Sequence, residues 1–354
     1  MIKVFVNKKW VKYLGIALVL YSTFAGLLVP LAPGIAELKS SEISGPGSIE
    51  IGIEGYNTHF SEEIPIKSWL RRGSLYLCAN RVEVIDEQNL VINFEVVPAF
   101  LIDTIKDYTS DLILNSERDG NIAYRNGLIV KQLIPNTLID GELPDCQRKI
   151  KNRTASGVNF PNREILYETI RNLFFHVPMW FAMTLLFLFS MIASIFYMRT
   201  LNPRYDLFAS SLAHVGLLLG VLATLTGMLW AQYAWGRAWS GDVKQNMAAI
   251  SLLIYFAYFI LRNSLEEDQI RARASSVYNI FAFISVIVLL FAVPRFQDSL
   301  HPGSGGNPGF GTYDLDGLMR LVFYPAVIGW TLIAVWIASI RYRMTIINRK
   351  IDQF

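Results

Sequence analysis

A tryptophan-rich segment between two long apolar stretches carries the residues whose types best suggest chemistry. It reads Trp230-Ala-Gln-Tyr-Ala-Trp235-Gly-Arg-Ala-Trp239-Ser-Gly-Asp242. Indole rings offer flat apolar faces and are common at membrane boundaries. We therefore expect a surface for a large planar ligand, with Asp242 orienting the loop or capping the following helix. The residues expected to form this platform are Trp230, Trp235, Gly236, Trp239 and Asp242.

Two of the four histidines fall on the same side of the membrane as this segment. His176 stands at the outer end of the second apolar stretch, and His301 lies in an outer loop. Two neutral imidazoles on opposite sides of a flat ligand are a common way to hold haem iron, so the pair predicts axial haem ligation. Alternatively, each histidine satisfies a helix end or bonds in the headgroup zone. His214 and His59 are expected to be structural.

A haem also needs cationic partners for its two propionates. Arginine grips carboxylates bidentately, and lysine acts as a point charge. The candidates near the histidines and the tryptophans are Arg171, Arg237, Lys244 and Arg295. Basic residues at these positions are equally compatible with ordinary interfacial anchors.

The composition indicates a membrane protein, since 53% of the 354 residues are hydrophobic and only 17% are charged. A bilayer span needs about 20 mostly apolar residues, and such stretches should be helices because lipid offers no hydrogen-bond partners. The net charge of +3 is too small to argue for nucleic acid. The six expected spans are roughly 13–32, 173–197, 207–233, 246–262, 277–296 and 319–340.

The basic residues predict the orientation, because cytoplasmic loops carry the excess of lysine and arginine. Thirteen flank one side of the six spans and four flank the other, so both termini should be cytoplasmic and the tryptophan segment periplasmic. The first span is longer than the core of a signal peptide and is expected to be a retained anchor. The thirteen are Lys3, Lys8, Lys9, Lys12, Arg199, Arg204, Arg262, Arg271, Arg273, Arg341, Arg343, Arg349 and Lys350, and the four are Arg237, Lys244, Arg295 and Arg320.

The segment 37–169, between the first two spans, is polar and rich in turn signals. Alternating stretches at 48–54, 74–78, 90–96 and 112–115 have the period of half-buried strands. Turn signals at 54–57, 118–120 and 125–127 separate several of them. A small β-sandwich outside the membrane is expected.

Both cysteines, Cys78 and Cys146, lie in this segment, where a disulfide could persist. A buried strand cysteine with a free loop cysteine is an equal alternative. Neither belongs to a Cys-x-x-Cys or Cys-x-x-Cys-His motif, so redox chemistry and covalent haem attachment on this chain are unsupported.

The expected fold is an α-helical polytopic membrane protein with six transmembrane helices and an inserted extracytoplasmic all-β, sandwich-like domain. Its parts are a cytoplasmic N-terminus with the first helix (1–36), the inserted domain (37–169), a five-helix remainder (170–345) and a cytoplasmic tail (346–354).

A specific resemblance is carried by the tryptophan segment and its surroundings. The run 235–242, followed by 248–258, resembles the signature Trp-Gly-x-x-Trp-x-Trp-Asp of haem-handling cytochrome c assembly proteins. Within that superfamily, Arg171-x-x-x-x-His176-Val-Pro178 and Leu300-His301 resemble the CcmC type, which presents haem to the haem chaperone CcmE. The likeness covers six spans and about 200 of the 354 residues.

The resemblance implies a non-enzymatic haem-delivery factor in a bacterial inner membrane. His176 and His301 would be the axial ligands of a non-covalent, transient haem b, with the 235–242 loop under the ring and Arg171 and Lys244 near the site. The implied partners are a CcmE-type chaperone and ATP-binding-cassette subunits of the CcmA and CcmB type. The chain has no Walker loop, so it would not hydrolyse ATP itself.

Two departures from the family pattern stand out. Ala238 and Gly241 occupy positions where the family carries aromatic residues, which removes stacking surface. The insertion of about 130 residues replaces what is usually a short outer loop, and suggests extra contacts with the chaperone or a substitute for a missing subunit.

Three rival functions come from other classes. A haem lyase of the cytochrome c synthase type is one, since the Trp-Ser-Gly-Asp-Val-Lys stretch also resembles that branch, although additional histidines and spans are missing. A membrane b-type cytochrome would need histidines paired across helices, and His214 has no such partner in a neighbouring span. A receptor or anchor bearing a sandwich would bind no haem.

Overall fold

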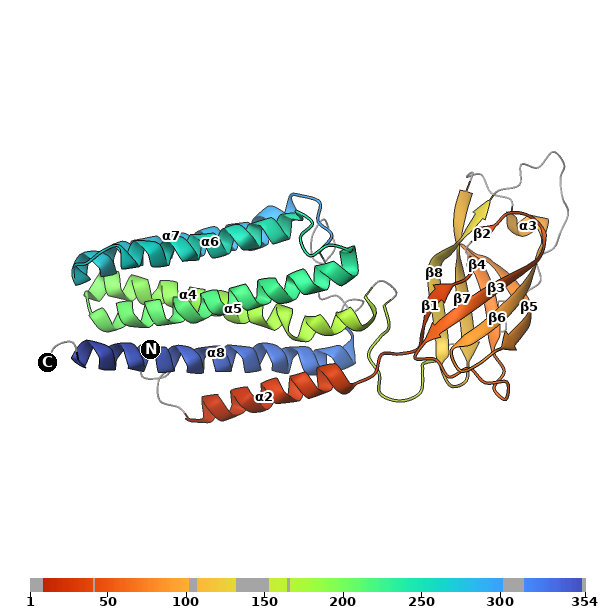
Figure 1. Cartoon of the computed structure of the whole chain (residues 1–354), viewed down its shortest axis with the longest axis horizontal. Coiled ribbons are helices and arrows are strands. Elements are labelled where there is room, and N and C mark those ends of the chain that lie inside the picture. The colour runs from red at the N-terminus through yellow and green to blue at the C-terminus, as the bar shows by residue number, and fades with distance from the viewer. Residues whose placement is uncertain are drawn as a thin grey trace. The chain divides into compact units, whose positions relative to one another are not determined.

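The chain divides into two compact units in the computed structural model (Figure 1). One unit is Val29–Glu168, and the other joins Met1–Leu28 to Thr169–Phe354. The structure describes residues 9–40, 42–101, 107–131, 153–163, 166–301 and 315–351.

Long apolar helices build the second of these units. Before α4 lies the 3-10 helix η2 (Tyr167–Phe174), and α7 continues through a π-helical turn η3 (Val288–Ala292) into η4 (Val293–Arg295). Within the described ranges, six helical segments are long and apolar enough to cross a membrane, so the chain is a multi-pass membrane protein. The helices are α2 (Lys9–Leu28), α4 (His176–Thr200), α5 (Pro203–Trp235), α6 (Val243–Asn263), α7 (Asp268–Ile287) and α8 (Gly317–Ile351).

The predicted spans are all helical, and the first one ends earlier than expected. Helix α2 stops at Leu28 instead of reaching residue 32, because Pro30 lacks the backbone N–H that would continue it. The last helix extends beyond its apolar stretch at both ends, to Gly317 and Ile351.

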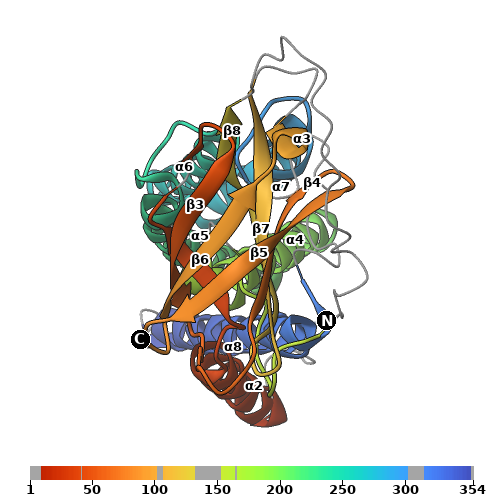
Figure 2. The same ribbon diagram turned by 90° about the vertical axis from the view of Figure 1, so that its right-hand side faces the viewer.

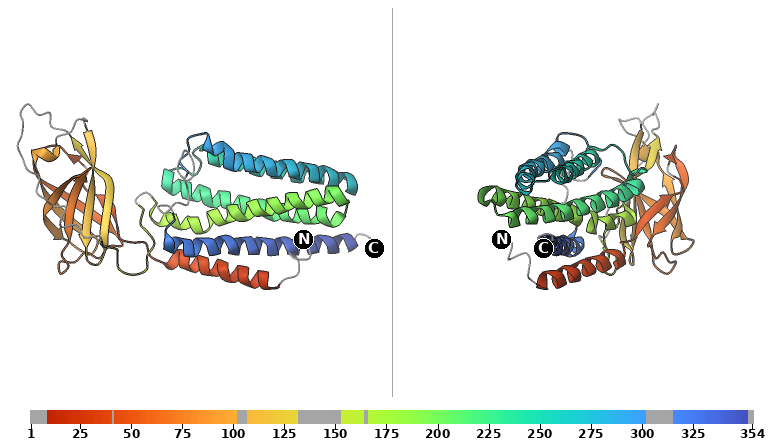
Figure 3. Two further views of the ribbon diagram at one scale, coloured as in Figure 1. Left: turned by 180° about the vertical axis from the view of Figure 1, so that it is seen from behind. Right: turned by 60° about the vertical axis from the view of Figure 1, so that its left-hand side comes forward.

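The helices lie side by side, with α4 and α5 in the middle of the unit (Figures 1 and 3). Helix α2 lies at one edge and packs on α8. A Cβ atom added to Gly15 of α2 would lie 3.0 Å from Leu332, and one added to Gly329 of α8 would lie 2.9 Å from Leu18. Small residues at such contacts let two helix backbones approach closely in lipid.

Buried polar side chains cross-link three of the helices. The amide of Asn279 in α7 donates to the hydroxyls of Ser190 and Ser194 in α4, at 2.7 and 2.9 Å, and accepts from Tyr255 of α6 at 3.2 Å. Each of these polar groups is thereby paired, as an apolar interior requires.

A second polar link is an ion pair between α5 and α6. The guanidinium of Arg262 donates to both carboxylate oxygens of Asp206, at 2.6 and 2.7 Å, and both side chains are less than 10% exposed. The pair joins the first turn of α5 to the last turn of α6.

Removal of one member of this pair should be more harmful than removal of both. Asp206→Leu leaves the Arg262 charge buried without its partner, which we expect to cost about 3–5 kcal/mol of unfolding free energy. The double variant Asp206→Leu/Arg262→Met should recover most of that loss. Denaturant unfolding in detergent micelles measures both, and equal losses in the two variants would contradict this account.

The other unit is a single antiparallel sheet with one parallel edge. Its strand order is β1-β3-β6-β5-β4-β7-β8-β2, and β2 pairs in parallel with β8. The short helix α3 (Pro98–Leu101) follows β6. The strands are β1 (Gly34–Leu38), β2 (Glu42–Ile43), β3 (Gly47–Tyr56), β4 (Lys67–Arg72), β5 (Leu75–Val84), β6 (Asn89–Val96), β7 (Asp107–Ser116) and β8 (Gly120–Lys131).

This sheet curls into a half-barrel, whereas the sequence predicts a sandwich of two sheets (Figure 2). The terminal members of the strand order, β1 and β2, are neighbours in the chain, and β1 pairs with β3 while β2 pairs with β8. A chain that contributes adjacent strands to both ends of a sheet must bend the sheet round its core. Ile51, Ile92 and Leu112 are among the buried residues of that core.

One predicted turn in this unit is wrong. The Arg125-Asn-Gly127 signal lies inside β8, where Asn126 has a φ of 53° and the pairing with β7 shifts register. The backbone N–H of Asn126 donates to Asp111 at 2.9 Å. Asparagine tolerates this left-handed conformation, so the signal marks a β-bulge instead of a hairpin.

Only one of the two cysteines lies among the described residues. Cys78 lies on β5 and is disulfide-bonded. Cys146 lies outside the described residues, as does the glycine-rich stretch 303–311.

Candidate functional site

The tryptophan-rich segment is mostly helix. Helix α5 continues through Trp235 and ends at Gly236, whose φ of 74° closes the helix in the left-handed conformation. No residue before Gly236 breaks the helix, so Trp230 and Trp235 stand on its last two turns and Trp239 alone lies in the link. The link between α5 and α6 is therefore shorter than the tryptophan-rich segment.

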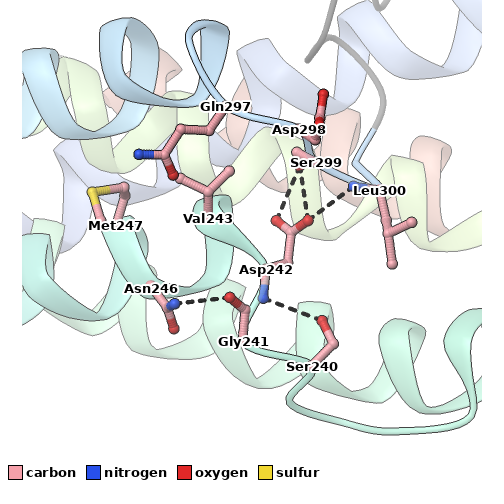
Figure 4. A pocket seen from close by; sticks show the side chains of 10 residues that line it. All are labelled: Ser240, Gly241, Asp242, Val243, Asn246, Met247, Gln297, Asp298, Ser299 and Leu300. Carbon is pink, nitrogen blue, oxygen red and sulfur yellow. Dashed lines mark hydrogen bonds between the residues drawn. The ribbon is translucent and has the colours of Figure 1, made fainter.

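The link itself is tied down by side chains of α6. The buried Gln245 accepts from the Ser240 backbone N–H at 2.8 Å and donates to the Ala238 carbonyl at 3.1 Å. The amide of Asn246 donates to the Gly241 carbonyl at 2.8 Å (Figure 4). Gly241 has a φ of 76°, a conformation that strains any aromatic residue. The departure from the family pattern at Gly241 thus matches its backbone.

Asp242 is the N-cap of α6, as predicted, and has three further donors. Its carboxylate accepts from the backbone N–H of Lys244 at 2.9 Å and from that of Leu300 at 2.9 Å. The hydroxyl of Ser299 donates to it at 2.9 Å, and Nδ1 of His301 lies 3.0 Å from it. Burial raises the pKa of Asp242, but these donors lower it by more, so the net pKa lies below its usual value.

His301 is held against two tryptophans by this carboxylate. Its ring centroid lies 4.7 Å from that of Trp235, edge to face, and 5.9 Å from that of Trp230. The two indoles contact one another at 4.9 Å. Trp239 makes no ring contact with any described residue and is 39% exposed. Of the three tryptophans predicted to form the platform, Trp230 and Trp235 therefore pack together and Trp239 lies apart from them.

The protonation of His301 follows from its surroundings. Burial lowers the pKa of His301 below its usual value, although Asp242 acts in the opposite direction. The imidazole is therefore neutral at pH 7. An ionised carboxylate only accepts hydrogen bonds, so Nδ1 carries the proton and Nε2 keeps its lone pair.

His176 has the same tautomer for a different reason. It is the first residue of α4, and its Nδ1 lies 2.7 Å from the carbonyl oxygen of Ala223 and 3.4 Å from the Thr226 hydroxyl, both on α5. A carbonyl cannot donate, so Nδ1 carries the proton. Among the described residues, Nε2 of neither His176 nor His301 has a hydrogen-bond partner. The two imidazoles are close enough to interact electrostatically.

A glycine makes room for His176. A Cβ atom added to Gly227 would lie 2.5 Å from Cε1 of the imidazole. A glycine inside a transmembrane helix is the sequence signal of such a close approach. Gly227, Ala223 and Gln245 were not among the predicted site residues, because none of them has a side chain that binds haem.

The four candidate cations are placed differently. Arg237 and Arg295 are exposed and have no hydrogen bond or ion pair to the described part of the chain. Arg171 donates to the carbonyl of Gly26 in α2 at 2.8 Å. Lys244 is part-buried in the first turn of α6.

The other two histidines also have hydrogen-bond partners. Nδ1 of His214 lies 2.8 Å from the Ser210 carbonyl of its own helix, and its ring contacts Phe259. Nδ1 of His59 lies 3.2 Å from the buried carboxylate of Asp119 in the half-barrel.

A shallow pocket of about 480 Å³ opens beside Asp242. Figure 4 shows it between the first turn of α6, with Asn246 and Met247, and the segment from Gln297 to Leu300. The carboxylate of Asp242 points to Ser299 and Leu300 across it. Neither histidine lines this pocket, so it is a neighbour of the histidine cluster and not part of it.

Comparison with known proteins identifies the family. The family model for CcmC, heme exporter protein C, matches residues 157–354. This chain belongs to the CcmC family. The match contains both histidines and the tryptophan segment, and starts after nearly all of the half-barrel.

Individual relatives agree with that assignment. Heme exporter protein C of Bradyrhizobium diazoefficiens is 28% identical over 184 residues, covering 52% of this chain and 69% of the relative. Heme exporter protein C of Paracoccus denitrificans is 24% identical over 183 residues, covering 52% of this chain and 76% of the relative. The cytochrome c biogenesis protein CcsA of Fagopyrum esculentum is 27% identical over 115 residues, or 32% of this chain and 34% of the relative.

Proposed function

We propose that this CcmC-type protein binds haem at the periplasmic face of a bacterial inner membrane and presents it for cytochrome c maturation. The observation that supports this most is the matched tautomer of His176 and His301. Both are set to offer Nε2, the atom that a haem iron takes from histidine, and one of them stands against two indole rings.

The residues divide the task of holding the cargo. His176 and His301 ligate the iron, Trp230 and Trp235 support the ring, and the exposed Trp239 covers it from the link. Arg237 and Arg295 are the cations most available to the propionates. Arg171 and Lys244 assist through the helix ends that they occupy, with Gly236 and Asp242 shaping the link.

The haem is bound without a covalent bond to the chain. Both cysteines precede residue 157, so they lie outside the matched family region, and neither belongs to a haem-attachment motif. The protein therefore acts as a carrier and not as an enzyme. Its partners are a haem chaperone of the CcmE type and the ATP-binding-cassette subunits CcmA and CcmB, and the half-barrel supplies extra contacts with the chaperone or substitutes for a missing subunit.

Loss of either ligand should abolish the low-spin haem spectrum. We expect His176→Ala and His301→Ala, each purified after growth with haem supplied, to lose the bands of two-histidine ligation. His214→Ala removes a histidine of the same unit that serves its own helix, and should leave those bands unchanged. Visible absorption spectra decide the matter, and unchanged low-spin spectra in both ligand variants would refute the assignment.

A methyl group beside His176 should have a smaller but related effect. In Gly227→Ala the new Cβ forces the imidazole to move, so we expect a lower low-spin fraction and weaker haem retention. Gly216→Ala on the same helix meets Phe187 at 2.6 Å and no histidine, and is the matched control for overpacking. Equal haem retention in the two variants would show that the position of His176 is irrelevant.

The identity of the partner protein distinguishes delivery of haem to a chaperone from covalent attachment of haem to an apocytochrome. We expect the haem-loaded protein to co-purify with the haem chaperone and to lose that association in His301→Ala. A haem lyase of the cytochrome c synthase type would instead co-purify with an apocytochrome bearing a Cys-x-x-Cys-His motif. Affinity purification with each candidate co-expressed separates the two functions.

A further inference from the structure

The two histidines donate to acceptors of different charge. Nδ1 of His301 donates to the carboxylate of Asp242 at 3.0 Å, whereas Nδ1 of His176 donates to the neutral carbonyl of Ala223 at 2.7 Å. A carboxylate behind an imidazole raises its basicity as a metal ligand and fixes the orientation of the ring. The neutral carbonyl fixes the tautomer of His176 but adds no charge.

The Asp242 carboxylate is itself held in place. It is 3% exposed and accepts from Ser299, Leu300 and Lys244 as well as from His301. Since donors surround it, the carboxylate stays directed at Nδ1 of His301. Ionised carboxylates with several N–H and O–H donors are also stable when buried.

The two imidazoles also differ in their aromatic contacts. His301 packs on both Trp230 and Trp235, while the ring contact of His176 is with Trp180, at 6.3 Å between centroids. His301 is thus held by a carboxylate and two indole rings, whereas His176 is held by a neutral carbonyl and a single indole ring.

We propose that Asp242 is a positioning residue that fixes the tautomer of His301 and makes it the stronger of two unequal iron ligands. With haem bound, an incoming neutral nitrogen donor of the imidazole class would displace His176 first, while His301 would keep the haem on the protein. The inference rests on the proposed haem site and adds an order to the release of its cargo: the Nε2–iron bond of His176 breaks, the incoming donor bonds to that face, and His301 leaves last.

The order can be tested with exogenous imidazole on the full-length protein loaded with haem in detergent. We expect His176→Ala to retain haem through His301 and to regain a low-spin spectrum when imidazole is added. His301→Ala should lose haem about 10-fold faster than His176→Ala, measured as transfer to apomyoglobin. Equal loss rates, or faster loss from His176→Ala, would overturn the order.

The role of Asp242 is tested by Asp242→Asn. Asparagine is also a good N-cap, so the start of α6 is preserved while the charge is removed. We expect haem loss to accelerate about 10–100-fold and the reduction potential of the bound haem to become more positive, because a charge that stabilises ferric iron is lost.

A control variant separates this role from a general effect of charge. Asp298→Asn removes an equal charge from the same pocket, and no described residue bonds that carboxylate. It should leave the potential unchanged. If Asp242→Asn leaves the potential unchanged, or Asp298→Asn shifts it as much, the proposal fails while two-histidine ligation stands. Unchanged spectra in His176→Ala and His301→Ala would remove the haem site itself.

Discussion

The arrangement of the segment between α7 and α8 against the start of α6 depends on one carboxylate. Asp242 begins α6 and at the same time binds the backbone of Leu300, the hydroxyl of Ser299 and the ring of His301. Burial of a carboxylate costs free energy, which here is offset by four donors. The consequence is that a helix cap also fixes the position of a histidine 59 residues further along the chain.

The position of His176 is determined by the packing of α4 on α5. On α5, Gly216, Gly220 and Gly227 each lie close to a side chain of α4, and the last of these side chains is His176. Without Cβ atoms in the way, α4 and α5 approach until Nδ1 of His176 reaches the Ala223 carbonyl. His176 is thereby positioned by the packing of two helices, and His301, which lies in a loop, by its hydrogen bond to the N-cap residue of α6. Two imidazoles whose Nε2 atoms have no hydrogen-bond partner among the described residues thus arise from two unrelated constraints.

Much of this could be predicted from sequence, where the cause is local. Apolar length gives the six spans, because lipid leaves a chain no alternative to helix, and topology then assigns His176, His301 and the tryptophans to one side. The cap role of Asp242 follows from its place before α6. The half-barrel and the bulge at Asn126 could not be predicted, since strand pairing joins residues distant in the chain. For the same reason, the bond between Asp242 and His301 has no signal in the spacing of either residue.

The weakened tryptophan motif has a physical reading within the proposed function. Of the two departures, only Gly241 stands on a tryptophan of the family signature, and it adopts a φ of 76°. Ala238 falls on a variable position, and its carbonyl is bound by Gln245. Trp230 and Trp235 remain on a helix against His301, while Trp239 is exposed on the link. A planar cargo on such a site has a rigid support on the His301 side and little aromatic cover elsewhere. Each ring missing from the link removes about 0.5–1.5 kcal/mol of possible stacking. A carrier tolerates that loss better than a storage protein does, because the cargo has to leave.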